Sequence, residues 1–278
     1  MIDFFIPLED WINIGFEKVS YYLSPFLRAA SEFLGVIIDG FEDLLLWPPE
    51  IVIMILVALL VWILASYRLA IFAFVGLLIT FGLDIWEPTM STVALALSGT
   101  AVSLLVGVPL GIFASQSNVV ERILRPILDF MQTLPSFVYL IPAVMFFGMG
   151  KVSALVAIMI FAMPPAVRLT TLGIREVSGE MVEAARAFGS GRWQTLKDVQ
   201  LPLAIPTIMA GVNQCIMMAL AMTVIASMIG GGGLGNVVLR SMQTLNIGMG
   251  AVGGLGIVIL AILLDRLTET LSKKVKKD

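Results

Sequence analysis

From residue 51 onward, the chain consists of long apolar stretches separated by short polar breaks. A helix needs about 20 apolar residues to cross a hydrocarbon core of about 30 Å. The first two apolar stretches are the weakest, because 51–83 as one helix would be roughly 50 Å long, too long for a single crossing. A tight turn at Ser66–Arg68 resolves this, and one crossing by 51–83 stays the alternative. The pattern therefore predicts seven spans, at 51–66, 69–86, 91–115, 127–148, 152–173, 202–229 and 247–264.

Residues 1–50 have a different pattern, in which apolar positions recur at helical spacing and acidic residues fill the opposite face. Pro7, Pro25 and Pro48-Pro49 interrupt this stretch. We expect one or two amphipathic helices that lie along the membrane interface or pack on the spans. The predicted protein is all-α and polytopic, with an amphipathic extension (1–50), an accessory transmembrane hairpin (51–90), a main transmembrane domain (91–270) and a basic tail (271–278).

The composition also indicates a protein whose solvent is the bilayer. Of the 278 residues, 59% are hydrophobic and 13% are charged, whereas soluble domains have about 45–50% and about 25%. The chain has no His and one Cys, Cys215, which nearly excludes metal sites, disulfides and Cys/His nucleophiles. We therefore expect no catalytic residue and no metal, and the net charge of −3 gives no support for a nucleic-acid partner.

Lys and Arg are distributed unevenly between the connections, and this bias predicts orientation. Basic residues gather in the tail and in the 116–126 and 174–201 connections, whereas residues 1–50 hold nine acidic residues against Lys18 and Arg28. We therefore expect the C-terminus in the cytoplasm and the N-terminus outside. If 51–83 crosses once, the N-terminus moves inside.

The predicted spans contain almost no charge in their central parts. Ion- and proton-coupled carriers usually have charged groups at membrane depth, but here Asp129 and Arg168 lie near predicted span ends. A phosphate-binding loop needs Gly-Lys followed by Ser or Thr, and Gly150-Lys151 is followed by Val152. If the chain moves a solute uphill, its energy must come from another subunit. An ion-coupled carrier and a membrane scaffold or sensor stay as alternatives.

The 174–201 connection is the longest polar break between the predicted spans. Ser178 can cap a short helix that has acidic residues early and Arg186 late, the charge order that suits the helix dipole. Gly189 can end this helix, because glycine readily adopts a positive φ. Such a short, capped helix would be a rigid lever for a partner docked against it.

The same connection resembles the E-A-A-x-x-x-G-x(9)-I-x-L-P motif of ABC importer permeases. The matching residues are Glu183-Ala184-Ala185, Gly189, and Val199, Leu201 and Pro202, with Val in place of Ile. In that family the motif forms a coupling helix, here 178–190, which docks on a separate ATPase subunit. The ATPase would bind ATP and Mg²⁺, so no cofactor is expected in this chain. The resemblance implies the docking residues Glu183, Ala184, Ala185, Arg186 and Gly189.

Three further stretches, 131–152, 168–177 and 202–235, resemble permeases of glycine betaine/proline betaine uptake systems. This resemblance covers about 90–270 and implies a five-span permease core in a bacterial cytoplasmic membrane. It also implies a permease homodimer and an extracytoplasmic substrate-binding protein. The implied solute is glycine betaine or a related quaternary amine; a methionine-like amino acid, choline and carnitine remain alternatives.

The candidate solute-path residues are neutral, with amide, aromatic or thioether side chains. Aromatic faces attract quaternary ammonium groups by about 0.5–2 kcal/mol, and buried amides should face the bundle interior. Hydrogen bonding between helices is the alternative role for the amides. The candidates are Gln132, Phe137, Tyr139, Asn213, Gln214 and Met217.

Four consecutive glycines follow the predicted 202–229 span on the outer side. Such a run cannot maintain a helix, because glycine loses too much conformational entropy. We expect either an outer gate or a tight external loop at Gly230, Gly231, Gly232 and Gly233.

Overall fold

The computed structural model describes residues 7–275, and this part of the chain is built from helices α1 to α12 with no strand. The predicted all-α fold is confirmed. Residues 1–6 of the predicted extension and residues 276–278 of the predicted tail lie outside the described residues.

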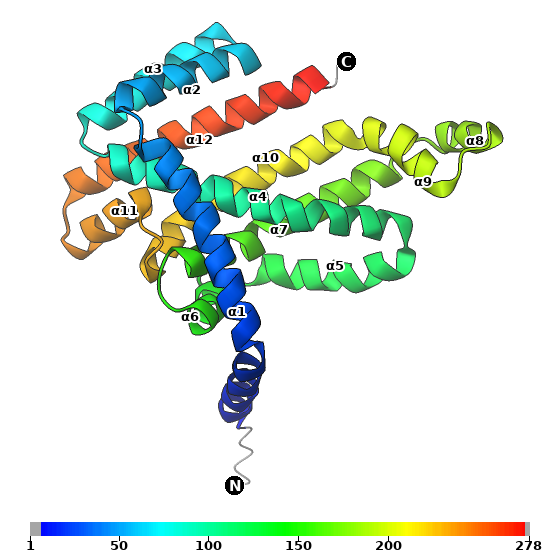
Figure 1. The fold of residues 1–278 in the computed structure, drawn as a ribbon, viewed down its shortest axis with the longest axis horizontal. Coiled ribbons are helices and arrows are strands. Elements are labelled where there is room, and N and C mark those ends of the chain that lie inside the picture. The colour runs from blue at the N-terminus through cyan, green and yellow to red at the C-terminus, as the bar shows by residue number, and fades with distance from the viewer. Residues whose placement is uncertain (1–6, 276–278) are drawn as a thin grey trace.

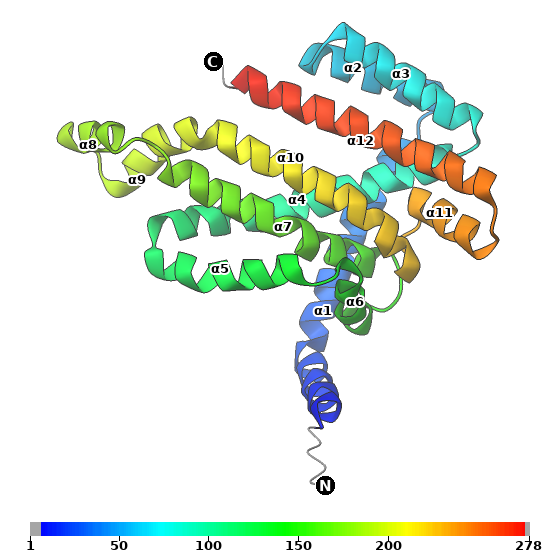
Figure 2. The same ribbon diagram turned by 180° about the vertical axis from the view of Figure 1, so that it is seen from behind.

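Four long helices form the main bundle: α4 (Trp86–Gln116), α7 (Lys151–Arg175), α10 (Leu201–Ala226) and α12 (Ile247–Val275). They lie side by side in both views, and α10 runs opposite to the other three (Figures 1 and 2). The core between α4, α7 and α10 contains fully buried apolar side chains such as Leu155, Ile158 and Met222. The spans predicted at 91–115, 152–173 and 247–264 are thus present as helices.

A stripe of small residues lets α4 and α7 approach closely. Gly99, Ser103, Gly107 and Gly111 recur every four residues along α4, the small-xxx-small pattern of packed membrane helices. A Cβ placed at Gly99 would lie 2.5 Å from Ile158 Cγ2. The Ser103 hydroxyl donates to the Gly99 carbonyl (2.7 Å) and the Met159 carbonyl (3.1 Å). Backbone proximity therefore holds this helix pair together.

The number of helices that can cross a membrane is lower than the seven spans predicted. Within the described residues, four continuous segments are long and apolar enough: α4, α7, the stretch Arg192–Ile229 and α12. The number rises to six if each of two sharply bent helix pairs counts as one span. The seventh predicted span corresponds to α3 (Tyr67–Gly82), whose 16 residues give about 24 Å of helix against a core of about 30 Å.

The predicted span 127–148 is not one helix, and this prediction is wrong. The chain forms α5 (Asn118–Thr133), a 3-10 turn (Ser136–Tyr139) and α6 (Leu140–Phe147), with a bend of 109° after α5. The cause is Pro135, which lacks an N–H and forces the preceding residue out of the helical region. Leu134 accordingly has φ −67° and ψ 137°.

The N-terminal extension is a single helix, α1 (Leu8–Leu46), in spite of Pro25 at its middle. Pro25 has no N–H to donate to the Tyr21 carbonyl, and the Ser24 hydroxyl donates to that carbonyl instead, at 2.9 Å. The C-terminal part of α1 packs on the bundle, where Ile38 is fully buried. Packing on the spans is therefore confirmed for this part, and the other end of α1 projects from the bundle (Figure 1).

The stretch predicted as an accessory transmembrane hairpin folds into two helices, and its crossing of the membrane stays a prediction. Helix α2 (Glu50–Leu64) begins after Pro48-Pro49 at 102° to α1, and α3 follows antiparallel to it. Ser66 caps α3 by accepting from the Leu69 N–H at 3.3 Å. A single continuous helix over 51–83 is excluded.

Glu42 on α1 joins the starts of α4 and α7. Its carboxylate accepts from the Ser91 hydroxyl at 2.6 Å and forms an ion pair with Lys151. The Glu42 side chain is only 13% exposed. A carboxylate in this position needs both partners, because burying an unpaired charge is costly.

We expect Lys151→Met to weaken the attachment of α1. The variant leaves Glu42 without its cation, at a cost of about 2 kcal/mol for a pair that is partly exposed. This corresponds to a fall of about 4–8 °C in the thermal unfolding midpoint of the purified permease. Lys18→Met on the exposed part of α1 is the control and should leave the midpoint unchanged. Equal midpoints for the two variants would contradict the anchoring role of Glu42.

The polar connection before α10 is shorter than predicted. It contains α8 (Gly179–Ala187), and helical structure resumes with α9 (Arg192–Thr195) and a π turn (Leu196–Gln200) that lead directly into α10. After α10, a 3-10 turn (Ser227–Ile229) and a glycine turn precede α11 (Gly233–Gln243). Both views place α8 at the end of the bundle with the α4–α5 turn and the C-terminal end of α12, and α11 at the opposite end (Figures 1 and 2).

Candidate functional site

Helix α8 projects from the end of the bundle and contains no buried residue (Figure 1). It ends in a Schellman motif: the Gly189 N–H donates to the Arg186 carbonyl at 2.9 Å, and the Ser190 N–H donates to the Ala185 carbonyl at 3.1 Å. Gly189 has φ +87°, as this motif requires. The predicted helix and its glycine stop are confirmed.

The predicted cap at the other end of α8 is wrong in its chemistry. Ser178 occupies the N-cap position, but its side chain makes no capping hydrogen bond. The Ser178 carbonyl instead accepts from the N–H groups of Met181 (3.1 Å) and Val182 (3.3 Å). The first turn of α8 is thus stabilised by the backbone alone.

The five predicted docking residues lie on this projecting element. Glu183, Ala184, Arg186 and Gly189 are exposed, and Ala185 is half-buried. Sequence reasoning missed a large aromatic beside them: Phe188 is 93% exposed, and Met181 is 49% exposed. An aromatic this open on a short helix is typical of a protein–protein contact residue. The signal was available, because Phe188 lies directly before the Gly189 stop.

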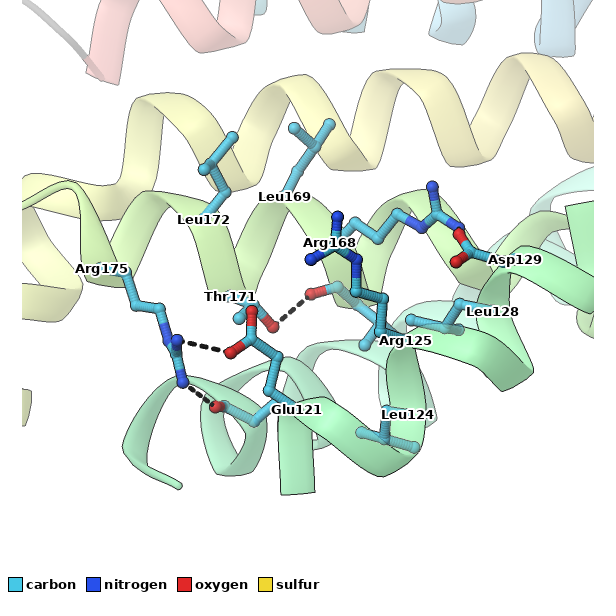
Figure 3. A pocket seen from close by; sticks show the side chains of 12 residues that line it. Glu121, Leu124, Arg125, Leu128, Asp129, Arg168, Leu169, Thr171, Leu172 and Arg175 are labelled. Atoms are coloured by element: carbon cyan, nitrogen blue, oxygen red, sulfur yellow. Dashed lines mark hydrogen bonds and ion pairs between the residues drawn. The ribbon is translucent and has the colours of Figure 1, made fainter. Parts of the chain in front are cut away.

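A cleft of about 420 Å³ lies between α5 and α7 (Figure 3) and reaches Arg175, the last residue of α7 before α8. Helix α5 is strongly amphipathic, and Leu128 is its one fully buried residue. Apolar side chains of both helices line the cleft, among them Leu124, Leu128, Leu169 and Leu172. Charged side chains from the same two helices point into it.

Two ion pairs join α5 to α7 across this cleft. Arg168 Nη2 lies 2.5 Å from Asp129 Oδ1, and Arg175 Nη1 lies 2.5 Å from Glu121 Oε2. Arg175 also donates to the carbonyl of Ala114 at 2.9 Å. These groups were not predicted to interact, and no spacing along the chain indicates it, because each pair links residues from two helices that α6 separates in sequence.

The structure does not bring the six predicted solute-path residues together. Gln132, Phe137 and Gln214 are exposed, and Met217 is half-buried. Tyr139 is buried with its ring 6.2 Å from that of Phe161, and its hydroxyl donates to the Met131 carbonyl. None of the six lines the α5–α7 cleft.

Asn213 links α10 to α12. Its Nδ2 donates to Asp265 Oδ1 at 3.2 Å, and its Oδ1 accepts from the Thr268 hydroxyl. This geometry supports the alternative role that the sequence left open, hydrogen bonding between helices. Gln214, the next residue, lies on the exposed side of α10, so the two amides lie on different faces of this helix. A role in the solute path stays a prediction for all six residues.

The glycine run forms a tight turn between the starts of α4 and α7. Gly230, Gly232 and Gly233 have φ of +92°, +75° and +66°. The Gly150 N–H donates to the Ile229 carbonyl at 2.8 Å, and the Leu234 N–H donates to the Thr92 hydroxyl at 2.8 Å. The predicted break in the helix is confirmed. Its role as an outer gate stays a prediction.

Comparison with known proteins places this architecture among transport proteins. The family described as "Binding-protein-dependent transport system inner membrane component" matches residues 107–277. The glycine betaine/carnitine transport permease protein GbuB of Listeria monocytogenes is 49% identical over 277 residues, with 98% of each chain covered. The glycine betaine/proline betaine transport system permease protein ProW of Escherichia coli is 46% identical over 268 residues, covering 96% of this chain and 76% of the relative.

A solved structure has the same fold at low sequence identity. A chain of the MetNI methionine ABC transporter, in inward-facing conformations, superposes with a TM-score of 0.62 at 20% identity. The match covers 66% of this chain and 93% of that chain.

Proposed function

The chain belongs to the binding-protein-dependent transport system inner membrane components, the permease subunits of ABC importers, and from this we propose that it imports glycine betaine or a related zwitterion with a quaternary ammonium group. A permease of this family is not an enzyme, and ATP is bound and hydrolysed by a separate subunit. Its partners are that ATPase and a substrate-binding protein, and its place is the inner membrane.

The single observation that carries the substrate class is the near full-length similarity to two betaine permeases. GbuB is named for glycine betaine and carnitine, and ProW for glycine betaine and proline betaine. These three solutes share a quaternary ammonium and a carboxylate. Choline has no carboxylate, and a methionine-like amino acid has a primary ammonium, so both fit this shared chemistry less well.

The exposed helix α8 supports the proposal for how energy reaches the chain. We place α8 in the cytoplasm, together with the C-terminus, because the basic connections lie at the α8 end of the bundle. Two copies of the chain form the pathway, and nucleotide-driven closure of the ATPases moves the two α8 helices together. The small Ala184 and Ala185 side chains allow the ATPase subunit to approach α8 closely.

We propose a division of the chain into a core, an extension and a hairpin that fits the same arrangement. Residues 91–270 act as the permease core, residues 1–50 as an extension anchored by Glu42, and residues 51–90 as an accessory hairpin. The helix α1 and hairpin α2–α3 contact the outside of the bundle rather than its centre, which suits an accessory role.

The test is uptake into proteoliposomes that contain the permease with its ATPase and binding protein. We expect ATP-dependent accumulation of glycine betaine, with carnitine and proline betaine as weaker or equal substrates and methionine not transported. Omitting ATP should abolish accumulation even when a sodium or proton gradient is imposed. Accumulation by the permease alone under such a gradient would contradict the proposal and favour an ion-coupled carrier.

A further inference from the structure

We propose that the α5–α7 cleft is a weak binding site for the transported zwitterion, in which Arg125 holds the solute carboxylate. This inference rests on the proposed function, because it takes the solute class from there. It adds a site within the permease chain, and none of the six solute-path residues predicted from the sequence lines this site.

Arg125 is the unpaired cation of the cleft. It lines the cavity, and its side chain enters the cleft between the two ion pairs (Figure 3). Arg168 and Arg175 each bind a carboxylate, whereas the Arg125 side chain makes no hydrogen bond or ion pair within the described range 7–275. A guanidinium presents several N–H donors in a plane that matches a carboxylate, so Arg125 is ready to receive one.

The charge of the cleft matches a single carboxylate. Three guanidinium groups, of Arg125, Arg168 and Arg175, face two carboxylates, of Glu121 and Asp129. The ion pairs neutralise two of the positive charges and leave one. The carboxylate of a zwitterionic solute can pair with this remaining guanidinium, that of Arg125.

The size and lining of the cleft fit a small zwitterion. Its volume of about 420 Å³ is at the lower end of the range for small-molecule sites, about 300–1,000 Å³. A quaternary ammonium carries methyl groups and no N–H, so it needs apolar contact rather than hydrogen-bond acceptors. Leu124, Leu128, Leu169 and Leu172 provide that contact.

The site is built for low affinity. The side chains of Arg168 and Asp129 are 40% and 56% exposed, so water screens their charges and each contact contributes little. We expect a dissociation constant of about 1 mM or weaker. The cleft includes Arg175 at the end of α7 that leads to α8, so a weak site there suits release of solute delivered through the pathway.

The test measures binding of radiolabelled glycine betaine to the permease–ATPase complex in phosphatidylcholine nanodiscs, without binding protein. We expect Arg125→Gln to weaken this binding at least 10-fold and Arg125→Lys to weaken it less. The matched control is Arg122→Gln, because Arg122 lies on the same helix outside the cleft; it should bind like the wild type. Tetramethylammonium, which has no carboxylate, should compete weakly and equally in the wild type and Arg125→Gln.

Two outcomes overturn the site. Identical binding by Arg125→Gln and Arg122→Gln excludes Arg125 as the carboxylate receptor. Loss of glycine betaine binding when phosphatidylglycerol is added to the nanodiscs assigns the cleft to an anionic lipid headgroup instead. Wild-type ATP-driven uptake, measured with binding protein present, separates the two proposals: uptake without binding in the cleft contradicts the site alone, and absence of uptake contradicts the proposed function.

Discussion

Phe188→Ser is expected to lower ATP-driven uptake by about 100-fold while the permease itself stays folded. Phe188 has almost no contact within the chain, so the variant costs the fold nothing. In the complex, burial of the Phe188 ring against the ATPase is worth about 2–4 kcal/mol. Losing this contact weakens ATPase binding by the factor that corresponds to this free energy. Copurification of the ATPase and uptake in proteoliposomes measure the two consequences.

A matched control separates docking from general surface effects. Tyr22 is 80% exposed and lies on α1, which projects from the bundle in a different direction from α8 (Figure 1). Tyr22→Ser should retain both the ATPase and uptake. Glu183→Arg on α8 should resemble Phe188→Ser, because it reverses a charge on the docking surface. Retained ATPase and full uptake in both α8 variants would show that α8 is not the docking element.

Gly111→Leu is expected to prevent accumulation of folded permease. A Cβ at Gly111 would lie 2.6 Å from Thr170 Cβ and 2.7 Å from the Val167 carbonyl oxygen. The carbonyl belongs to the backbone of α7 and cannot move aside, so α4 and α7 must separate. Separation also breaks the hydrogen bond from the Thr171 hydroxyl to the Gly111 carbonyl, which is 3.1 Å long. Overpacking costs about 1–3 kcal/mol for small additions, and a leucine adds far more volume.

The comparison for this variant is a glycine with open space around it. A Cβ at Gly254 on α12 would meet no neighbouring atom within 4 Å, so Gly254→Ala should be neutral or stabilising by up to about 1 kcal/mol, since alanine favours the helix. Gly111→Ala should already lower the thermal midpoint. The readouts are the yield of monodisperse protein and the unfolding midpoint. Equal yields for Gly111→Leu and Gly254→Ala would contradict the close packing of α4 and α7.

Those parts of the fold that depend on local patterning could be predicted from the sequence. The apolar runs of α4, α7 and α12 and the polar helix α8 with its glycine stop follow from hydropathy, spacing and one conformational preference. The break after α5 was also open to prediction, because Leu134-Pro135 carries a known restriction. Hydropathy alone favours one continuous span at 127–148, and it gives no weight to that restriction.

The charged cleft depends on how helices pack, and the sequence does not reveal it. Asp129 and Arg168 were visible near span ends, but their partnership requires α5 to fold back against α7. The same holds for Asn213, whose partners on α12 lie more than fifty residues away. The four-residue spacing of small residues on α4, in contrast, was a usable signal for the α4–α7 contact. An interaction between two helices that are far apart in sequence becomes visible only in the folded structure.

The most direct test of the central claim asks on which side of the membrane α8 lies and what covers it. Cys215 is the one cysteine of the chain and is fully buried, so Ala184→Cys in a Cys215→Ala background gives a single exposed thiol. We expect a membrane-impermeant maleimide to label this variant in inside-out vesicles only, and the ATPase to protect the thiol. Labelling in right-side-out vesicles, or labelling that the ATPase leaves unchanged, would contradict the role of α8 as the inward-facing coupling helix.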